Sequence, residues 1–179
     1  SKEEGAKQLL VAGAGESWDS LVAHAVSKGL WGLENLSAIP GTVGGAVVQN
    51  IGAYGAAVSE TAQWVEAMHT ETHKVQTFTR EQCLFGYRDS IFKHTNNFVV
   101  TRAAFSLSST AASNLSYKDV AAVFADDSEP TLESIRAAVV AIRKEKFPNL
   151  SVEGTAGSFF KNPIVSKASA ELLRVKYPE

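Results

Sequence analysis

The stretch IPGTVGGAVVQNIGAYG, residues 39–55, decides how the chain is interpreted. It contains five glycines, one proline and no charged residue, and the uncharged run extends from Asn35 to Ser59. Glycine lets the backbone approach a ligand closely and presents N–H groups, so uncharged loops of this kind can bind phosphates or a flat ring system. Tight turns between buried strands explain such a run equally well, because it matches neither a P-loop nor a dinucleotide fingerprint.

Composition and charge exclude several classes of function. The stretch is not a membrane span, because Pro40, the glycines and the amides of Gln49 and Asn50 would leave backbone polar groups unsatisfied in lipid. With 17 Lys and Arg against 19 Asp and Glu, the net charge of -2 leaves no basic surplus for nucleic acid or an anionic membrane. The single cysteine, Cys83, cannot form an internal disulfide, which fits a cytoplasmic protein. Cys83 and the four scattered histidines make no metal-ligand pattern, so no metal site is expected.

Apolar patterns on both sides of the stretch predict strands. Residues 8–12 form a short apolar run, residues 62–78 form two runs around a polar turn at residues 70–73, and residues 98–107 form another. The side chains expected on one face of this last strand are Val99, Ala103, Phe105 and Leu107.

Helical spacing is found between these runs, so the fold class is α+β. One helix is expected to begin after Ser17, a suitable N-cap, and to end at Gly29. A second is expected to begin after Thr131 and to end at Phe147 and Pro148, where we place a domain boundary. Residues 108–116 are too polar to pack well and predict a loop, and residues 166–177 have a further helical pattern.

A second candidate site is FGYRDSIFK, residues 85–93. Arg88 could bind a carboxylate through both of its terminal nitrogens, with Asp89 orienting the guanidinium. Taken alone, a structural Arg–Asp pair at a domain seam is the better explanation.

A third candidate is GSFFKNP, residues 157–163. A Ser158 hydroxyl placed against Phe159 and Phe160 would be shielded from water, so its proton would go to a bound substrate. Serine is a weak acid and can protonate only a strongly basic carbon or oxygen. Without further context, an exposed turn beside a buried aromatic pair is favoured.

Together and in this order, the three stretches resemble the UDP-N-acetylenolpyruvoylglucosamine reductase (MurB) family. GLENLSAIPGTVGGAVVQNIGAYG, residues 32–55, resembles the family's flavin-contacting segment, and FGYRDSIFKH and GSFFKNP resemble its two central active-site motifs. The LSYKDV segment around Tyr117 is similar to the form of the family with an extra tyrosine-bearing loop. The resemblance implies the second half of a PCMH-type FAD-binding domain over residues 1–147, and the start of a MurB C-terminal substrate-binding domain over residues 148–179.

The resemblance also implies an activity, the NADPH-dependent reduction of UDP-N-acetylglucosamine enolpyruvate to UDP-N-acetylmuramate in peptidoglycan precursor synthesis. In the family, NADPH reduces FAD, and flavin N5 then gives a hydride to the methylene carbon of the enolpyruvyl ether. Ser158 is implied as the proton donor and Arg88 as the electrostatic partner of the substrate carboxylate. Tyr87 and Asn162 would line the substrate pocket, while Tyr117 and Lys146 would contact the UDP diphosphate. The residues implied in FAD contact are Ile39, Pro40, Gly41, Gly44, Gly45, Asn50, Gly52 and Tyr54.

Two parts of the family pattern are expected outside this chain. An N-terminal FAD lobe with its own Gly-rich phosphate loop should precede Ser1, and a segment with a catalytic glutamate should follow Glu179. The sequence therefore predicts a fragment that is inactive alone. Two alternatives stay open: another FAD oxidoreductase of the same broad fold acting on a hydroxy acid or sugar, and a non-catalytic nucleotide-sugar binding module. No protein partner is implied.

Overall fold

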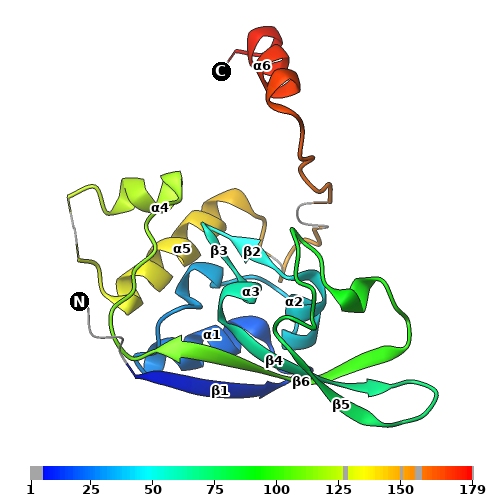
Figure 1. The fold of residues 1–179 in the computed structure, drawn as a ribbon. Helices are drawn as coiled ribbons and strands as arrows, with labels where there is room; N and C mark the ends of the chain where they lie inside the picture. Colours follow the sequence, from blue (N-terminus) through cyan, green and yellow to red (C-terminus); the bar gives the residue numbers. More distant parts are fainter. Residues whose placement is uncertain (1–5, 127–128, 150, 156–158, 179) are drawn as a thin grey trace. The chain divides into compact units, whose positions relative to one another are not determined.

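A four-stranded antiparallel sheet forms the framework of the computed structural model, which describes residues 6–126, 129–149, 151–155 and 159–178. The strand order is β1-β6-β4-β5 (Figure 1). The strands are β1 (Lys7–Gly13), β4 (Ala62–His69), β5 (Val75–Thr79) and β6 (Phe98–Ser108). The four apolar runs of the sequence therefore form the strands that were predicted, including the turn between β4 and β5.

One detail of the strand prediction is wrong, because the chain has a β-bulge in β6. Val65 pairs with Ala103 and Ala67 pairs with Val100, so one extra residue lies on β6 between these pairs. The extra residue reverses the alternation of side chains on its N-terminal side. Val99 is therefore exposed, and Val100 packs against the core in its place.

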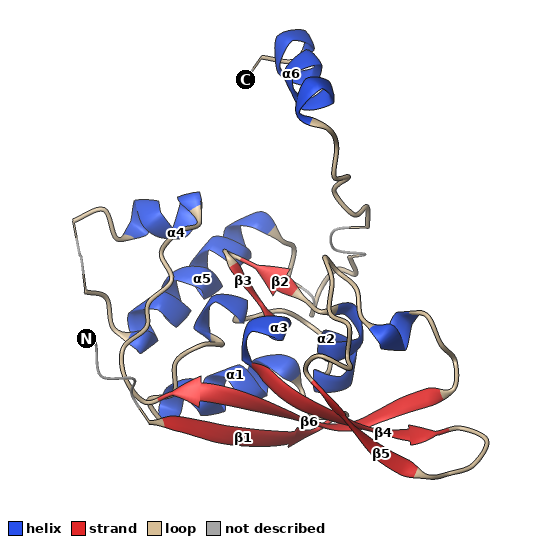
Figure 2. Ribbon diagram, in the orientation of Figure 1, coloured by secondary structure: helices blue, strands red, loops and turns tan. Residues whose placement is uncertain are grey.

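Helices cover one side of this sheet (Figure 2). The first, α1 (Trp18–Ser27), begins where the Ser17 hydroxyl accepts a hydrogen bond from the Ser20 N–H, and Gly29 follows it with φ +68°. The longest, α5 (Leu132–Lys146), begins in the same way at Thr131. Both starts agree with the capping residues expected from the sequence. The shorter helices are η1 (Glu34–Leu36), α2 (Val43–Gln49), α3 (Val58–Thr61), η2 (Ile91–Lys93) and α4 (Lys118–Val123).

The Gly-rich stretch forms a helix and a small hairpin. It does not form the tight turns between buried strands that were the alternative explanation of its glycines. Its first part becomes α2, and its second part becomes β2 (Gly52–Ala53), which pairs with β3 (Ala56–Ala57). Gly44 is required by packing, because a Cβ on it would lie 2.9 Å from the Ala14 Cβ. The main core lies between α1, α2 and the sheet, and a second cluster joins Tyr54 to Val120 of α4 and Val139 of α5.

The chain divides into two compact units, Ser1–Phe147 (unit 1) and Pro148–Glu179 (unit 2). Unit 1 contains the sheet and every helix up to α5, while unit 2 contains α6 (Lys167–Lys176), which starts at the Ser166 cap. The helix predicted over residues 166–177 is therefore confirmed. None of the described helices is both long and apolar enough to cross a membrane.

Glu34 is a buried carboxyl, with 2% of its surface exposed, and it accepts a hydrogen bond from the Gly32 N–H at 2.6 Å. Burial raises its pKa above the ordinary value of 4.5. An acid with a raised folded-state pKa stabilises the fold below its unfolded pKa, and this contribution is lost as pH rises through the folded pKa. Glutamine keeps an acceptor for Gly32 but carries no charge.

We therefore expect wild type to lose stability relative to Glu34→Gln as the pH rises from about 4.5 through the raised pKa. Urea unfolding of both proteins at a series of pH values measures the difference. A difference that stays constant with pH would show that the Glu34 carboxyl has the same pKa in the folded and unfolded chains.

Candidate functional site

The exposed part of the Gly-rich stretch presents backbone with almost no side chain. Pro40, Gly41, Thr42 and Gly45 are exposed, and a Cβ on Gly41 would meet no atom within 4 Å. Gly41 also has φ +118°, which favours glycine. A flat ligand could therefore approach this surface closely.

The amides at the start of α2 are already used within the protein, so they do not present the free N–H groups that a Gly-rich loop can offer. The N–H of Val43 donates to the Glu16 carbonyl and that of Gly44 to the Ala14 carbonyl, both at 2.9 Å. The Gly45 N–H donates to the Thr42 hydroxyl. A ligand at this surface would therefore not bind to the N–H groups of Val43, Gly44 and Gly45.

Asn50 and Tyr54, both predicted to contact the cofactor, have buried side chains. The Asn50 amide donates to the Gly86 carbonyl at 2.7 Å, and its oxygen accepts from the Ser59 N–H at 2.9 Å. The Asn50 side chain thus fastens the end of α2 to the loop that carries Arg88. Ile39 is half-buried against the main core.

Arg88 lies in a tight turn and reaches the Gly-rich stretch. Its φ of +54° is uncommon for a residue with a side chain, and the turn is closed by the Gly86 N–H, which donates to the Asp89 carbonyl at 2.9 Å. The guanidinium donates to the Gly52 carbonyl, and its Cζ lies 5.1 Å from the centre of the Tyr87 ring. Arg88, Tyr87 and Gly52, three predicted site residues, are therefore brought together.

The Asp89 carboxylate contacts the ring Nε2 of His94 at 2.8 Å and accepts from the Ser90 N–H. Asp89 was expected to orient the Arg88 guanidinium. The structure shows that the Gly52 backbone carbonyl is a direct hydrogen-bond partner of this guanidinium.

A second group of predicted residues lies around the tip of the β2–β3 hairpin. The rings of Tyr54 and Tyr117 meet edge to face, with centroids 5.2 Å apart. Lys146, at the end of α5, forms an ion pair with Asp119 of α4, and this carboxylate, followed by weaker effects of Tyr117 and Tyr54, raises the pKa of the lysine. Tyr117 is 41% exposed, so it can contact a ligand.

The hairpin therefore connects two predicted binding groups of unit 1. Gly52 at its base contacts Arg88, and Tyr54 at its tip contacts Tyr117. The base and tip belong to one short piece of backbone, so the positions of the two groups relative to each other are fixed by the fold.

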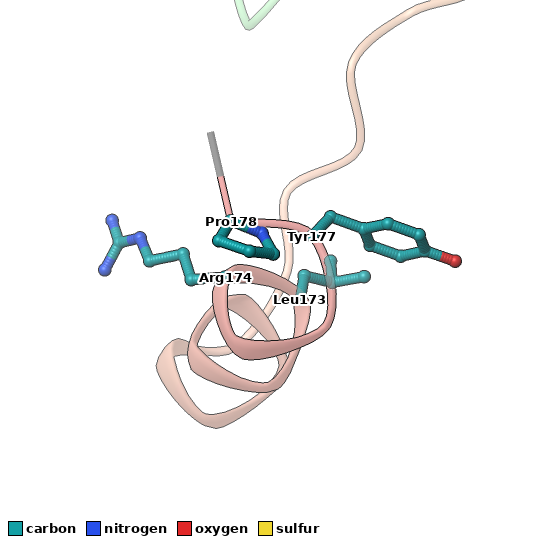
Figure 3. A pocket seen from close by; sticks show the side chains of 4 residues that line it. All are labelled: Leu173, Arg174, Tyr177 and Pro178. Carbon is teal, nitrogen blue, oxygen red and sulfur yellow. The ribbon is translucent and has the colours of Figure 1, made fainter.

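The predicted residues of unit 2 are not placed relative to those of unit 1. Ser158 and Gly157 lie outside the described residues, and Asn162 is exposed. Phe159 and Phe160 are 78% and 84% exposed and contact each other edge to face, so the aromatic pair is not buried. A surface hollow in unit 2 is lined by Leu173, Arg174, Tyr177 and Pro178, and none of these is a predicted site residue (Figure 3).

Sequence reasoning missed two polar residues that organise the hairpin tip, Asn35 and Asn114, and it also missed Asp119, which pairs with Lys146. Asn35 donates to the carbonyls of Tyr54 and Asn114, and Asn114 donates to the carbonyl of Gly55. Their partners are far away in the sequence, so no local spacing could have identified them. The polarity of residues 108–116, attributed to an exposed loop, was the available signal for Asn114, while Asn35 and Asp119 lie within stretches quoted for the family resemblance.

Comparisons with known proteins identify relatives of the chain. Residues 2–78 match the family model described as an FAD binding domain. The UDP-N-acetylenolpyruvoylglucosamine reductases of Amoebophilus asiaticus and Neisseria meningitidis are each 44% identical to the chain, over 94% and 96% of its length. The reductase of Yersinia pestis is 41% identical over 99% of it. The chain covers 51%, 51% and 52% of these relatives, so it spans about half their length.

A solved structure is similar as well. The crystal structure of UDP-N-acetylenolpyruvylglucosamine reductase (MurB) from Thermus caldophilus matches with a TM-score of 0.57 and 29% identity, covering 78% of this chain and 44% of that one. The match supports the α+β fold of the PCMH type, and the sequence likeness extends through both units. The chain therefore belongs to the UDP-N-acetylenolpyruvoylglucosamine reductase family.

Proposed function

We propose that the chain supplies flavin-contacting and substrate-binding surfaces of an enzyme that reduces UDP-N-acetylglucosamine enolpyruvate to UDP-N-acetylmuramate with NADPH. The observation that carries the proposal is the contact of the Arg88 guanidinium with the Gly52 carbonyl of the Gly-rich stretch. It places a cation, suited to a carboxylate, directly beside the segment that resembles a flavin-contacting surface.

The exposed residues of the Gly-rich stretch fit a flavin. Pro40, Gly41 and Gly45 leave the backbone open to a flat ring, and no charged side chain stands beside them in the sequence. Ile39, Gly44, Asn50, Gly52 and Tyr54 would support this surface from beneath, because they are buried or half-buried. FAD, when bound, supplies the hydride chemistry that links NADPH to the substrate.

Arg88 would bind the substrate carboxylate and stabilise the negative charge that builds up when a hydride reaches the adjacent double bond. Its guanidinium donates to only one carbonyl among the contacts described, so further N–H groups remain for a carboxylate. The turn at φ +54° and the ring of Tyr87 limit the movement of the side chain. A cation whose position is fixed in this way loses little free energy through reorganisation during the reaction.

Tyr117 and Lys146 would bind the diphosphate of the same substrate at the other end of the hairpin. The Tyr117 hydroxyl can donate a hydrogen bond, and the ammonium of Lys146 supplies charge. Asp119 holds this ammonium near the exposed tyrosine. A substrate with a carboxylate on one side and a diphosphate on the other suits two cationic groups at opposite ends of one hairpin.

Unit 2 would contribute the proton and part of the pocket. We assign Ser158 as the proton donor to the carbanion-like carbon, and Asn162 as a pocket residue. Unit 1 would be the flavin-binding subdomain, and unit 2 the beginning of the substrate-binding domain. A nucleotide-sugar substrate and a lone reduced cysteine are consistent with activity in the cytoplasm.

The proposal is tested on the purified full-length gene product. We expect a visible flavin spectrum, and NADPH oxidation that depends on UDP-N-acetylglucosamine enolpyruvate and yields a product heavier by two hydrogens. Binding of the nucleotide sugar without NADPH oxidation would instead identify a non-catalytic binding module. Turnover of a hydroxy acid or another sugar in place of the enolpyruvyl compound would identify a different oxidoreductase.

A further inference from the structure

Asn35 is a buried amide that joins three segments far apart in the sequence. It lies in η1, with 2% of its surface exposed, and its Nδ2 donates to the Tyr54 carbonyl at 2.7 Å and to the Asn114 carbonyl at 2.9 Å. Both partners are carbonyls, so only the nitrogen of the amide can face them. The Oδ1 atom is buried and has no hydrogen-bond partner among the described residues.

The two hydrogen bonds that Nδ2 donates therefore determine the orientation of the Asn35 side-chain amide. A buried acceptor without a partner opposes folding, and an apolar side chain of similar size would avoid that cost. The two donated bonds are the features of Asn35 that such a side chain could not replace.

The segment that Asn35 contacts is a strained turn. Tyr54 has φ +48° and Gly55 has φ +83°, the pattern of the two-residue hairpin turn in which both central residues have positive φ. Glycine adopts this conformation readily, whereas a tyrosine does so only when its surroundings stabilise it. Asn35 binds the carbonyl of Tyr54, and the Asn114 side chain binds that of Gly55 at 3.0 Å, so both residues of the turn are held by amides.

The Tyr54–Gly55 turn helps to determine the position of Tyr117. The buried ring of Tyr54 packs edge to face on the ring of Tyr117, which is the exposed member of the pair. The chain between Asn114 and Tyr117 is short, so the Asn114 carbonyl that Asn35 binds also limits the position of Tyr117. Two independent routes therefore lead from Asn35 to Tyr117.

We propose that Asn35 is a positioning residue for the diphosphate of a nucleotide ligand, acting through the Tyr54–Gly55 turn on Tyr117. The inference rests on the proposed function, because that function gives Tyr117 its ligand. Asn35 would affect binding of the diphosphate and would leave the chemical step unchanged, since Arg88 contacts the base of the hairpin and not its tip.

The test measures the affinity of UDP for the full-length gene product by calorimetry, together with KM and kcat for the enolpyruvyl substrate. Asn35→Leu removes both donated bonds and also the unpaired acceptor. We expect the Kd of UDP and the KM to rise about tenfold, the size expected for losing well-placed hydrogen bonds, with kcat unchanged. Asn114→Ala, which frees the Gly55 carbonyl, should raise both constants in the same direction by a smaller factor.

Val65→Ala is the matched control, because Val65 is fully buried in the main core and outside the cluster around Tyr54. It should lower the melting temperature while leaving the Kd of UDP unchanged, which separates positioning from general stability. An unchanged Kd in folded Asn35→Leu would overturn the inference, and if that variant does not fold, an unchanged Kd in Asn114→Ala would do so. Wild-type protein that binds no UDP would overturn the proposed function itself, and this inference with it.

Discussion

Ser158→Ala in the full-length gene product is expected to slow reoxidation of the reduced flavin by the enolpyruvyl substrate about 10²- to 10⁴-fold, and to leave flavin reduction by NADPH unchanged. The proposed role of Ser158 begins only after hydride has reached the substrate, so the first half-reaction does not require it. In the second half-reaction a basic carbon needs a proton from a positioned acid. Stopped-flow absorbance measures the two half-reactions separately.

Ser151→Ala provides the control, because Ser151 is an exposed serine of the same unit whose hydroxyl bonds only to Asn149 among the contacts described. Both of its half-reactions should match those of wild type. Equal slowing of both half-reactions in Ser158→Ala, or of neither, would mean that the proton comes from another group and that Ser158 is a structural residue of its turn.

Arg88→Met is expected to slow the second half-reaction roughly 100- to 1,000-fold, the cost of removing a fixed electrostatic partner from a developing negative charge. Methionine keeps much of the length of the side chain but cannot donate to the Gly52 carbonyl or to a carboxylate. Arg88→Lys should recover part of the rate, since a lysine keeps the charge and loses the planar pair of donors.

Gly52→Ala should reproduce part of the Arg88→Met defect without changing the arginine. A Cβ on Gly52 would clash with Arg88 Nη1 and would lie 3.0 Å from the Ala56 carbonyl oxygen, so the guanidinium has to move. Gly15→Ala is the matched control, because a Cβ there would meet nothing within 4 Å. If Gly52→Ala keeps the wild-type rate, the contact between Arg88 and the hairpin does not position the guanidinium for the reaction.

Much of the fold could be predicted from local patterns. The caps at Ser17 and Thr131 and the apolar runs of β1, β4 and β5 are properties of neighbouring residues, and these predictions are confirmed. The exception within β6 has a physical reason, since a β-bulge depends on how β6 pairs with β4, and the local sequence pattern of β6 does not reveal that pairing.

The candidate site was less accessible to sequence reasoning. Chemistry suggested Arg88 because guanidinium suits a carboxylate, but its partner Gly52 is 36 residues away, and only the folded chain reveals that contact. Asn35 was missed for the same reason, because its partners are 19 and 79 residues away. Local signals identified side chains with suitable chemistry, and long-range hydrogen bonds determine which of them meet.

The central claim is tested most directly by a single-turnover measurement on the full-length gene product. The protein is reduced with NADPH under anaerobic conditions and mixed with UDP-N-acetylglucosamine enolpyruvate while flavin absorbance is recorded. We predict that the oxidised flavin spectrum returns and that UDP-N-acetylmuramate forms in an amount equal to the flavin. A flavin that stays reduced in the presence of this substrate, in protein that binds UDP, would contradict the proposed function.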